Sequence, residues 1–299
     1  MANVSPLNFD RFDRQIRFLG KRAQKLISTT KVLMLGTGGG NSQVSIQLAC
    51  MGIGELFLVD PDRWAETDRN RVFIPREFVG KRKVSTLKKL IEEYFPDVRV
   101  DGIVTKAEYV PDEIYREADI IVVGTDTISS RIYANRKAII YRKPALFPYA
   151  SIYSEKGKLR QFFGVLQVYI PGKTPCFECW KNFDKYRLLA ESLDPKRREE
   201  FRQRYNLGDE LNIPVEASVS ALNYIIAGAA VWEILKIITS IDKPIPLQVY
   251  NGISRSGRLM ERINLKKDPN CPACSLARRL KSNSSLPSRE DLIKLGEKR

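Results

Sequence analysis

The sequence predicts an α/β protein with a doubly wound, mostly parallel sheet that continues into a mixed or antiparallel C-terminal extension. Three observations support this fold class. Short apolar runs alternate with helical stretches through the first half, a pattern typical of βαβ units whose parallel sheet is buried on both faces. A glycine-rich loop follows the first run. The second half carries two Cys-x-x-Cys pairs, so we also expect a structural metal site.

The first half contains the strands and helices of the expected core. In chain order these are strand 32–35, helix 42–51, strand 56–59, helix 83–94, strand 98–104 and strand 119–123. The apolar runs are short and rich in β-branched residues, which favours strands over buried helices. With a glycine loop between its first strand and first helix, this half predicts a Rossmann-like nucleotide-binding core.

The second half has a different pattern. We expect strands at 159–170, 247–250 and 259–265 and a long apolar helix at 215–238. Residues 181–212 are dense in both charges, and 194–205 show no apolar periodicity. Such a segment is most often a solvated helix or loop; the alternative is an insertion that binds a partner or gates the site.

These patterns divide the chain into four expected parts. They are an N-terminal arm (1–30), a nucleotide-binding core (31–175), a zinc-linked second half (176–274) containing the insertion 181–212, and a tail (275–299). The tail is expected to be either poorly ordered or a late-docking helix.

Composition excludes several kinds of chemistry. The 299 residues include no histidine, and the formal net charge is +15. Without histidine there is no Ser-His or Cys-His pair, no imidazole ligand and no histidine general base. The charge indicates a polyanionic partner, whether nucleic acid, nucleotide phosphates or an acidic protein. No apolar run approaches the roughly 20 residues that span a bilayer, and residues 1–9 lack a signal-peptide core. We therefore expect a cytoplasmic protein without membrane contact.

The loop after the first expected strand contains Gly36, Gly38, Gly39 and Gly40, followed by Asn41. Glycines let the backbone approach phosphates, and the amides at a helix N-terminus supply an anion site. Asp60 closes the next strand 24 residues after Gly36, where a carboxylate can bind ribose hydroxyls. These features also fit a nicotinamide or flavin dehydrogenase. Against that, Asn41 replaces the third glycine of the dinucleotide fingerprint.

Charges around the loop favour a nucleoside triphosphate. Cleavage between the α and β phosphates needs several cations, because negative charge develops on the phosphoryl oxygens as pyrophosphate leaves. Arg11, Arg14, Arg71 and Lys83 can supply them. Asp126 comes just after the run 120–123, at a strand end of the kind where ligands bind. A carboxylate that faces a triphosphate is a natural Mg²⁺ ligand.

Six segments, taken together, carry a family resemblance. They are 11–15 with Arg11 and Arg14, the loop 36–41, Asp60-Pro-Asp62, Asn70-Arg71, Gly80 to Lys83, and Thr125-Asp126 leading to Arg131. In this order and spacing they resemble the ThiF/MoeB-type superfamily, which includes ubiquitin-activating enzymes and the adenylyltransferases of sulfur-carrier proteins. The resemblance covers about residues 11–274. Asp68 and Val72 depart from it, since many relatives have Asn and Gln there.

The resemblance implies an adenylyltransferase. Such enzymes use ATP and Mg²⁺ to adenylate the C-terminal glycine carboxylate of a ubiquitin-like or sulfur-carrier protein ending in Gly-Gly, and they release pyrophosphate. They usually form homodimers, which would bring Arg14 as a finger into the second copy's site. The resemblance further implies that Gly39 contacts phosphate, Asp60 the ribose, Arg71 and Lys83 the triphosphate, and Asp126 the Mg²⁺. The expected catalytic residues are Arg14, Arg71, Lys83 and Asp126, and the expected nucleotide site is Gly36, Gly38, Gly39, Gly40, Asn41, Asp60, Asp62, Asn70, Arg71, Lys83, Asp126 and Arg131.

The two cysteine pairs have two-residue spacers and are separated by a gap of 91 residues; they are Cys176 and Cys179, and Cys271 and Cys274. Without histidine a zinc site must be all cysteine, and two such pairs can close a four-thiolate tetrahedral site. The long gap leaves a redox role open. The same pairs occur in many relatives, which favours structural Zn²⁺ joining the end of the insertion to the C-terminal strand. The fifth cysteine, Cys50, is expected to be a small buried packing residue.

Relatives that form a thioester or persulfide carry a cysteine shortly before the long helix, where this chain reads Asn212-Ile-Pro-Val-Glu-Ala217. We therefore expect adenylation without an enzyme thioester, with a sulfur donor or a conjugating enzyme as a further partner. Two alternatives stay open. A tRNA threonylcarbamoyladenosine dehydratase would suit the charge, but such relatives generally lack the paired cysteines, so nucleic acid is not our expected partner. A non-catalytic scaffold subunit is disfavoured by the presence of Arg14, Lys83 and Asp126.

Overall fold

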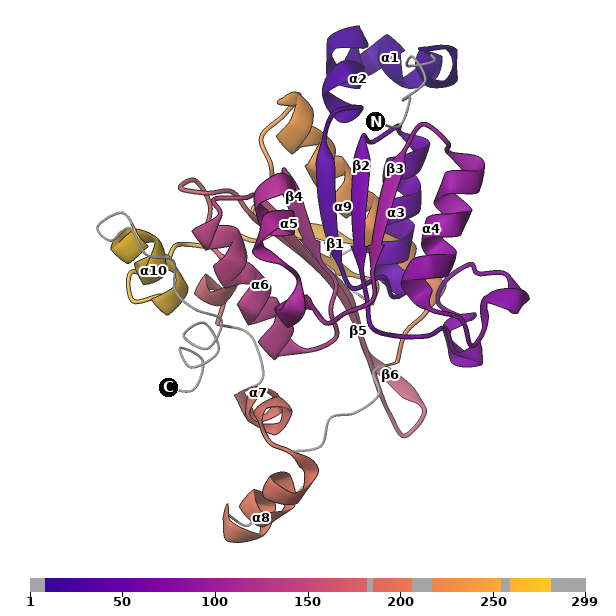
Figure 1. Cartoon of the computed structure of the whole chain (residues 1–299). Helices are drawn as coiled ribbons and strands as arrows, with labels where there is room; N and C mark the ends of the chain where they lie inside the picture. The colour runs from indigo at the N-terminus through magenta and orange to yellow at the C-terminus, as the bar shows by residue number, and fades with distance from the viewer. Residues whose placement is uncertain (1–8, 182–184, 206–216, 254–258, 281–299) are drawn as a thin grey trace.

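The protein folds around one eight-stranded sheet (Figure 1). The computed structural model describes residues 9–181, 185–205, 217–253 and 259–280. Across the sheet the strand order is β3-β2-β1-β4-β5-β6-β7-β8. The strands are β1 (Lys31–Leu35), β2 (Glu55–Val59), β3 (Arg99–Ile103), β4 (Ile120–Val123), β5 (Ala145–Glu155), β6 (Lys158–Tyr169), β7 (Leu247–Asn251) and β8 (Met260–Arg262).

The first five strands in this order are parallel and the last three pairings are antiparallel. This confirms the expected parallel core with an antiparallel extension. β1 lies between β2 and β4, with Val32 opposite both Leu56 and Ile120. The chain leaves β1 toward β2 and β3 on one side and later returns to β4 on the other. Such a reversal of strand order opens a crevice at the carboxyl ends of the strands.

Helices cover both faces of the sheet (Figure 1). The α-helices are α1 (Asp13–Leu19), α2 (Lys21–Ile27), α3 (Gly39–Cys50), α4 (Lys83–Tyr94), α5 (Asp112–Glu117), α6 (Ile128–Ile140), α7 (Lys185–Ser192), α8 (Pro195–Tyr205), α9 (Ser220–Thr239) and α10 (Pro272–Leu280). Apolar residues of α3, α4 and α9 share one core with the sheet, and those of α5 and α6 share a second core with its other face. β1, β2 and β4 are therefore buried from both sides, which explains their nearly continuous apolar sequence.

Short 3-10 helices connect several of these elements. They are η1 (Phe9–Phe12), η2 (Glu66–Asp68), η3 (Arg76–Phe78), η4 (Ala107–Tyr109) and η5 (Phe177–Cys179). η2 and η3 lie in the connection from β2 to α4, and η5 ends at Cys179, with Cys176 as its N-cap. Both connections matter for the sites described below.

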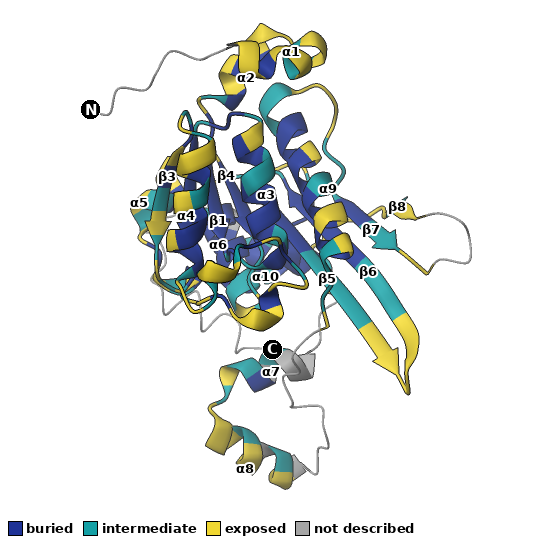
Figure 2. Cartoon of the chain, turned by 90° about the vertical axis from the view of Figure 1, so that its right-hand side faces the viewer, coloured by how far each residue is buried: buried dark blue, intermediate teal, exposed yellow. Residues whose placement is uncertain are grey.

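The antiparallel part contains a strand that the sequence did not reveal. β5 pairs with β6 along its whole length, and the tip of this hairpin is exposed and extends from the body (Figure 2). Pro148 lies inside β5, opposite Leu166. Because proline cannot donate to a strand ladder, its presence obscured the strand in the sequence.

Several boundaries differ from expectation. α3 begins at Gly39, so two glycines lie in its first turn. The long helix begins at Ser220, because Ala217 forms an isolated bridge with Ile152; residues 215 and 216 lie outside the described residues. The expected strand 259–265 is only β8, of three residues. The charged stretch 194–205 contains α8, which stands away from the sheet in both views (Figures 1 and 2).

Two expectations were wrong: that no apolar stretch approaches the length that spans a bilayer, and that Cys50 is buried. α9 has 20 residues and a mean hydropathy of 1.6 over its most apolar window, so by length and composition it could cross a membrane. However, 56% of that window is buried, and the helix packs on α3, β5 and β6. Packing in the core therefore explains its apolar sequence. Cys50 is exposed rather than buried, because the last turn of α3 directs Leu48 and Ala49 into the core instead.

Candidate active site

The glycine loop crosses the end of β4 at close range. Gly36 has φ +81°, and a Cβ there would lie 2.8 Å from the carbonyl oxygen of Gly124. Asn41 lies buried beneath the loop and donates to the carbonyls of Leu35 (3.2 Å) and Gly36 (2.9 Å). These contacts fix the turn, and only glycine fits at its crossing point.

The N-terminus of α3 is open. Gly38 is its N-cap, so the cap position provides no side-chain hydrogen bond, and the first turn holds no acidic residue. A Cβ at Gly38 or Gly40 would meet no described atom within 4 Å. An uncapped helix N-terminus with free space in front of its amides is a binding site for an anion such as phosphate.

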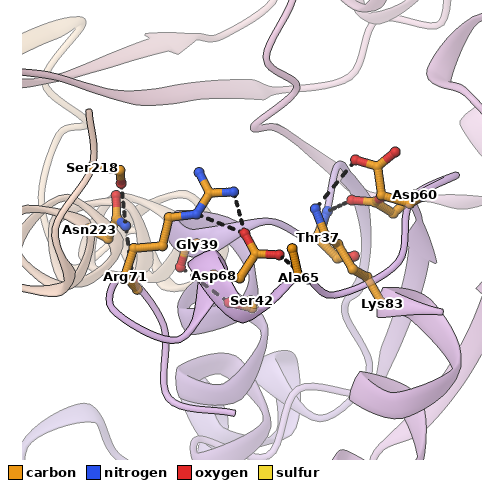
Figure 3. Close-up of polar contacts among 11 residues, drawn as sticks. Thr37, Gly39, Ser42, Asp60, Ala65, Asp68, Arg71, Lys83, Ser218 and Asn223 are labelled. Carbon is orange, nitrogen blue, oxygen red and sulfur yellow. Dashed lines mark hydrogen bonds and ion pairs between the residues drawn. The ribbon is translucent and has the colours of Figure 1, made fainter. Parts of the chain in front are cut away.

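Asp60, at the end of β2, braces this loop from the side (Figure 3). Its carboxylate accepts hydrogen bonds from the amide of Thr37 (2.6 Å) and from the amide of Asp62 (2.8 Å). Burial raises the pKa of the Asp60 carboxyl above its usual value, and the Thr37 amide and the Lys83 ammonium partly offset this rise. Each carboxylate oxygen has a second lone pair that could accept from a ribose hydroxyl.

Lys83 is the first residue of α4, and its side chain is only 7% exposed. Its Nζ lies 3.3 Å from Asp62 Oδ2 and 5.5 Å from the centre of the Trp64 ring. Asp62 is itself 56% exposed, so it can turn away toward solvent. The buried ammonium is thus held beside the glycine loop, where it can meet an anionic ligand.

Buried Asp68 ends η2 and pairs with Arg71, which lies three residues further along and is 29% exposed. The Arg71 guanidinium donates to Asp68 Oδ1 through Nε (2.9 Å) and Nη2 (Figure 3). Burial acts to raise the pKa of Asp68, but the Ala65 amide and the Arg71 guanidinium outweigh it and hold this pKa below its usual value. Asp68 therefore sets the direction of Arg71. The neighbouring departure, Val72, packs in a small apolar cluster with Trp64 and Ile74.

The first turn of α9 lies against the loop. Asn223 Nδ2 donates to the Arg71 carbonyl (3.1 Å) and to Ser218 Oγ (3.1 Å), and a Cβ at Gly39 would lie 2.7 Å from that same nitrogen. The backbone of Asn70 also accepts from the Ser220 amide (3.3 Å). Next to these contacts is a surface cavity of about 420 Å³, lined by Arg69, Asn70, Val72, Phe73, Ser220, Ala221 and Tyr224.

Asp126 and Arg131 flank the end of β4. Asp126 is exposed in the loop between β4 and α6, and its carboxylate is the type of ligand that Mg²⁺ prefers. Arg131 Nε donates to the Thr125 carbonyl (2.8 Å), and its guanidinium lies 5.0 Å from the centre of the Tyr149 ring. At the start of α6, Glu191 of α7 accepts from the amides of Ile128 (3.1 Å) and Ser129 (2.9 Å). The charged insertion therefore reaches this loop.

Arg14 lies at the opposite end of α3 from the glycine loop. It is exposed on α1, and the neighbouring Arg11 and Gln15 donate to the carbonyls of Ala49 (2.6 Å) and Met51 (2.9 Å), at the end of α3. α3 begins at the glycine loop and has 12 residues, so its far end is roughly 18 Å away. Within one chain the structure does not bring Arg14 to the loop.

The four paired cysteines form one cluster beneath α6. Their Sγ atoms all lie within 4.8 Å of one another, with Cys176 at 3.8 Å from Cys179 and 3.6 Å from Cys271. Zinc–sulfur bonds of about 2.3 Å in a tetrahedron place sulfurs about 3.8 Å apart. The donor set and spacing therefore fit a four-thiolate zinc site. The second pair lies at the start of α10, so the cluster joins the loop before the insertion to this helix and not to a strand.

A model of the ThiF family matches residues 12–273. The chain belongs to the ThiF family. Membership points to adenylyltransferase activity in general.

Individual relatives have low sequence identity to this chain but align with most of its length. Protein HesA of Leptolyngbya boryana is 26% identical over 282 residues, covering 92% of this chain and 88% of HesA. The sulfur carrier protein adenylyltransferase of Thermus thermophilus is 26% identical over 279 residues, covering 89% of this chain and 90% of that protein. The structure of E. coli MccB with ATP has a TM-score of 0.66 at 22% identity, covering 92% of this chain and 76% of MccB. This likeness shows that the fold is shared.

The structure gathers most of the predicted ThiF-type residues around one loop. The sequence assigned no positioning role to Asp68, Asn223 or Glu191, although these residues hold this region together. In the sequence, Asp68 stands out only as a departure from the family pattern, and Asn223 is a single amide in an apolar helix. The role of each predicted site residue and the four-part division of the chain stay predictions.

Removing the Asp68 carboxylate tests its hold on Arg71. We expect Asp68→Ala to lower kcat/KM for ATP roughly 10- to 100-fold, because a charged hydrogen bond that fixes an arginine contributes roughly 1.5–3 kcal/mol. Glu66→Ala is the matched control, since Glu66 pairs with Arg69 at the same spacing on the surface. Equal effects of the two substitutions would contradict the positioning role.

The same variant has a predicted pH dependence. The folded pKa of Asp68 is lowered, so its carboxylate stabilises the fold above the unfolded pKa of about 3.9, and that contribution is lost as pH falls through the folded pKa. The difference in free energy of unfolding between wild type and Asp68→Ala should therefore be constant above about pH 5 and shrink below about pH 4. Chemical denaturation at a series of pH values measures it.

Proposed function

We propose that the chain adenylates the C-terminal carboxylate of a ubiquitin-like or sulfur-carrier protein with ATP and Mg²⁺ and releases pyrophosphate. One observation carries the proposal: the open N-terminus of α3, the braced Asp60 and the cations Arg71 and Lys83 surround one glycine loop in a ThiF-family chain. This arrangement suits a ribose and a chain of phosphates. The relatives' names supply the class of acceptor.

The proposed reaction needs little proton transfer. The attacking carboxylate is already ionised at neutral pH, so the absence of histidine from the sequence is no obstacle. The main requirements are to bring two anions together and to stabilise the charge of the departing pyrophosphate. The α3 amides, Lys83 and Arg71 are suited to hold the phosphates, and Asp126 to hold Mg²⁺, which neutralises phosphate charge when bound.

A second copy of the chain would complete the site. Arg14 lies far from the glycine loop of its own chain, so it can act on a nucleotide only as a finger that reaches into another protomer. We propose a homodimer on this basis. The cytoplasmic location that we also propose rests on the sequence alone. Asn70 and the cavity beside α9 supply open surface near the glycine loop where such a finger could enter.

The acyl adenylate is proposed to pass to an external thiol. Four of the five cysteines share the buried cluster, and Cys50 lies at the end of α3 opposite the glycine loop. A sulfur donor or a conjugating enzyme would then receive the activated carboxylate directly. The insertion that carries α7 and α8 is a candidate contact for this protein, because Glu191 links it to the Asp126 loop.

Exchange of labelled pyrophosphate into ATP tests the proposed function. Purified small proteins that end in Gly-Gly should stimulate exchange, and the same proteins without the final glycine should not. Exchange without any carrier, or none with any ubiquitin-like or sulfur-carrier protein of the source organism, would contradict the proposal.

Lys83 should be needed for this exchange. We expect Lys83→Met to lower the exchange rate roughly 10²-fold, which is typical when one donor to developing negative charge is removed. Lys89→Met, an exposed lysine on the same helix, is the control and should retain wild-type exchange. A Lys83→Met rate within twofold of wild type, in a variant with an unchanged melting temperature, would remove Lys83 from the mechanism.

A further inference from the structure

Glu178 lies between the first two cysteines, and its side chain is buried against α6. It accepts from Arg136 Nε (3.0 Å) and Nη2 (2.9 Å) and from Asn135 Nδ2 (3.0 Å). The Arg136 and Glu178 side chains are each only 3% exposed. A two-pronged ion pair at this depth fixes both distance and angle between the cysteine loop and the helix.

The backbone of the same loop is held as well. The Phe177 amide donates to Asn135 Oδ1 (3.1 Å), and Gln167 of β6 donates to the Cys176 carbonyl (2.8 Å). The Phe177 ring stacks on Phe147 of β5 with centroids 4.8 Å apart. Residues 176–178 are thus fixed by α6, β5 and β6 independently of any contact among the sulfurs.

Stability alone does not explain a buried charge pair here. Two matched apolar side chains are often as stabilising as a buried ion pair, because desolvation offsets the electrostatic attraction. A four-thiolate zinc site also carries a net charge of roughly −2, so a carboxylate inside its loop is unfavourable unless a cation compensates it. The pair combines an anion in the loop with a cation on the helix, which makes the loop conformation depend on α6.

We propose that Arg136, with Asn135, is a positioning residue for the metal: it holds Glu178 so that Cys176 and Cys179 present their thiolates in zinc-binding geometry. Groups that orient ligands in this way typically change metal affinity 10–100-fold when removed. The inference rests on the cysteine cluster and is independent of the proposed adenylation.

Zinc affinity in competition with a chromogenic chelator tests the proposal. We expect Arg136→Met to bind zinc 10–100-fold more weakly than wild type. Lys236→Met is the matched control, because Lys236 and Glu233 form an equally buried pair on α9 (2.9 Å; 3% and 1% exposed). This variant should lose stability and keep wild-type zinc affinity.

Two further variants keep the test decisive. Arg136→Lys retains the charge but loses the two-pronged geometry, so its zinc affinity should fall between wild type and Arg136→Met. Replacing both Arg136 and Glu178 by Met removes the unpaired charge, which should restore stability but leave zinc affinity low. Wild-type affinity in Arg136→Met or in the double variant, or no stoichiometric zinc in the wild-type protein, would overturn the proposal.

Discussion

Replacement of Asp126 by alanine is expected to reduce carrier-dependent pyrophosphate exchange by roughly 10³-fold or more, because Mg²⁺ supplies several kcal/mol of charge stabilisation in phosphoryl transfer. Asp126 follows β4 at the carboxyl edge of the sheet, next to the crossing of Gly36 and Gly124. Its carboxylate is exposed. The loss should therefore affect metal binding and leave the core intact.

Several measurements separate this effect from damage to the fold. The melting temperature of Asp126→Ala should match that of wild type. Glu93→Ala, which removes an exposed carboxylate from α4, should exchange normally. Raising Mg²⁺ should partly restore exchange in Asp126→Asn, which retains one oxygen ligand. Wild-type exchange in Asp126→Ala at limiting Mg²⁺ would remove Asp126 from the metal site.

Local patterns predicted the parallel core well because each of its elements is specified by nearby residues. α4 covers the expected residues, 83–94, since its apolar face recurs with the helical period. β1, β2 and β4 differ by only one residue from the expected runs. The helix of the glycine loop began earlier than expected because tertiary contacts outweigh the low helix propensity of glycine.

The parts that escaped prediction depend on contacts between distant segments. Asn223 bonds to Arg71 across 152 positions, and Glu178 meets Arg136 across 42. Neither pairing has a local signature, because a single amide in an apolar helix, or a charge between two cysteines, has many possible partners. The glycine loop and the charged residues around it could be identified from residue types, but the residues that hold them in place required the fold.

Removal of zinc is expected to produce the largest change in stability. A ligand that binds only the folded state stabilises it by about 4 kcal/mol at 1,000 times its dissociation constant. For a chain of this size that corresponds to a fall in melting temperature of roughly 6 °C after treatment with EDTA. The cluster is well placed for this effect because Cys176 and Cys271 are fully buried and join η5 to α10, far apart in sequence.

The loss should be local at first. α10 packs on α6 through Leu276 against Tyr133, and Cys271, Ala273 and Cys274 anchor it in the second core. Amide exchange should therefore quicken in α10 and η5 before it does in β1 or β4. Cys179→Ser should reproduce the effect of EDTA, whereas Cys50→Ser, at an exposed position, should not. If instead the protein as purified contains no zinc, and its four clustered cysteines are paired as disulfides, the cluster has a redox role. In that case EDTA would leave the melting temperature unchanged and a thiol reductant would lower it.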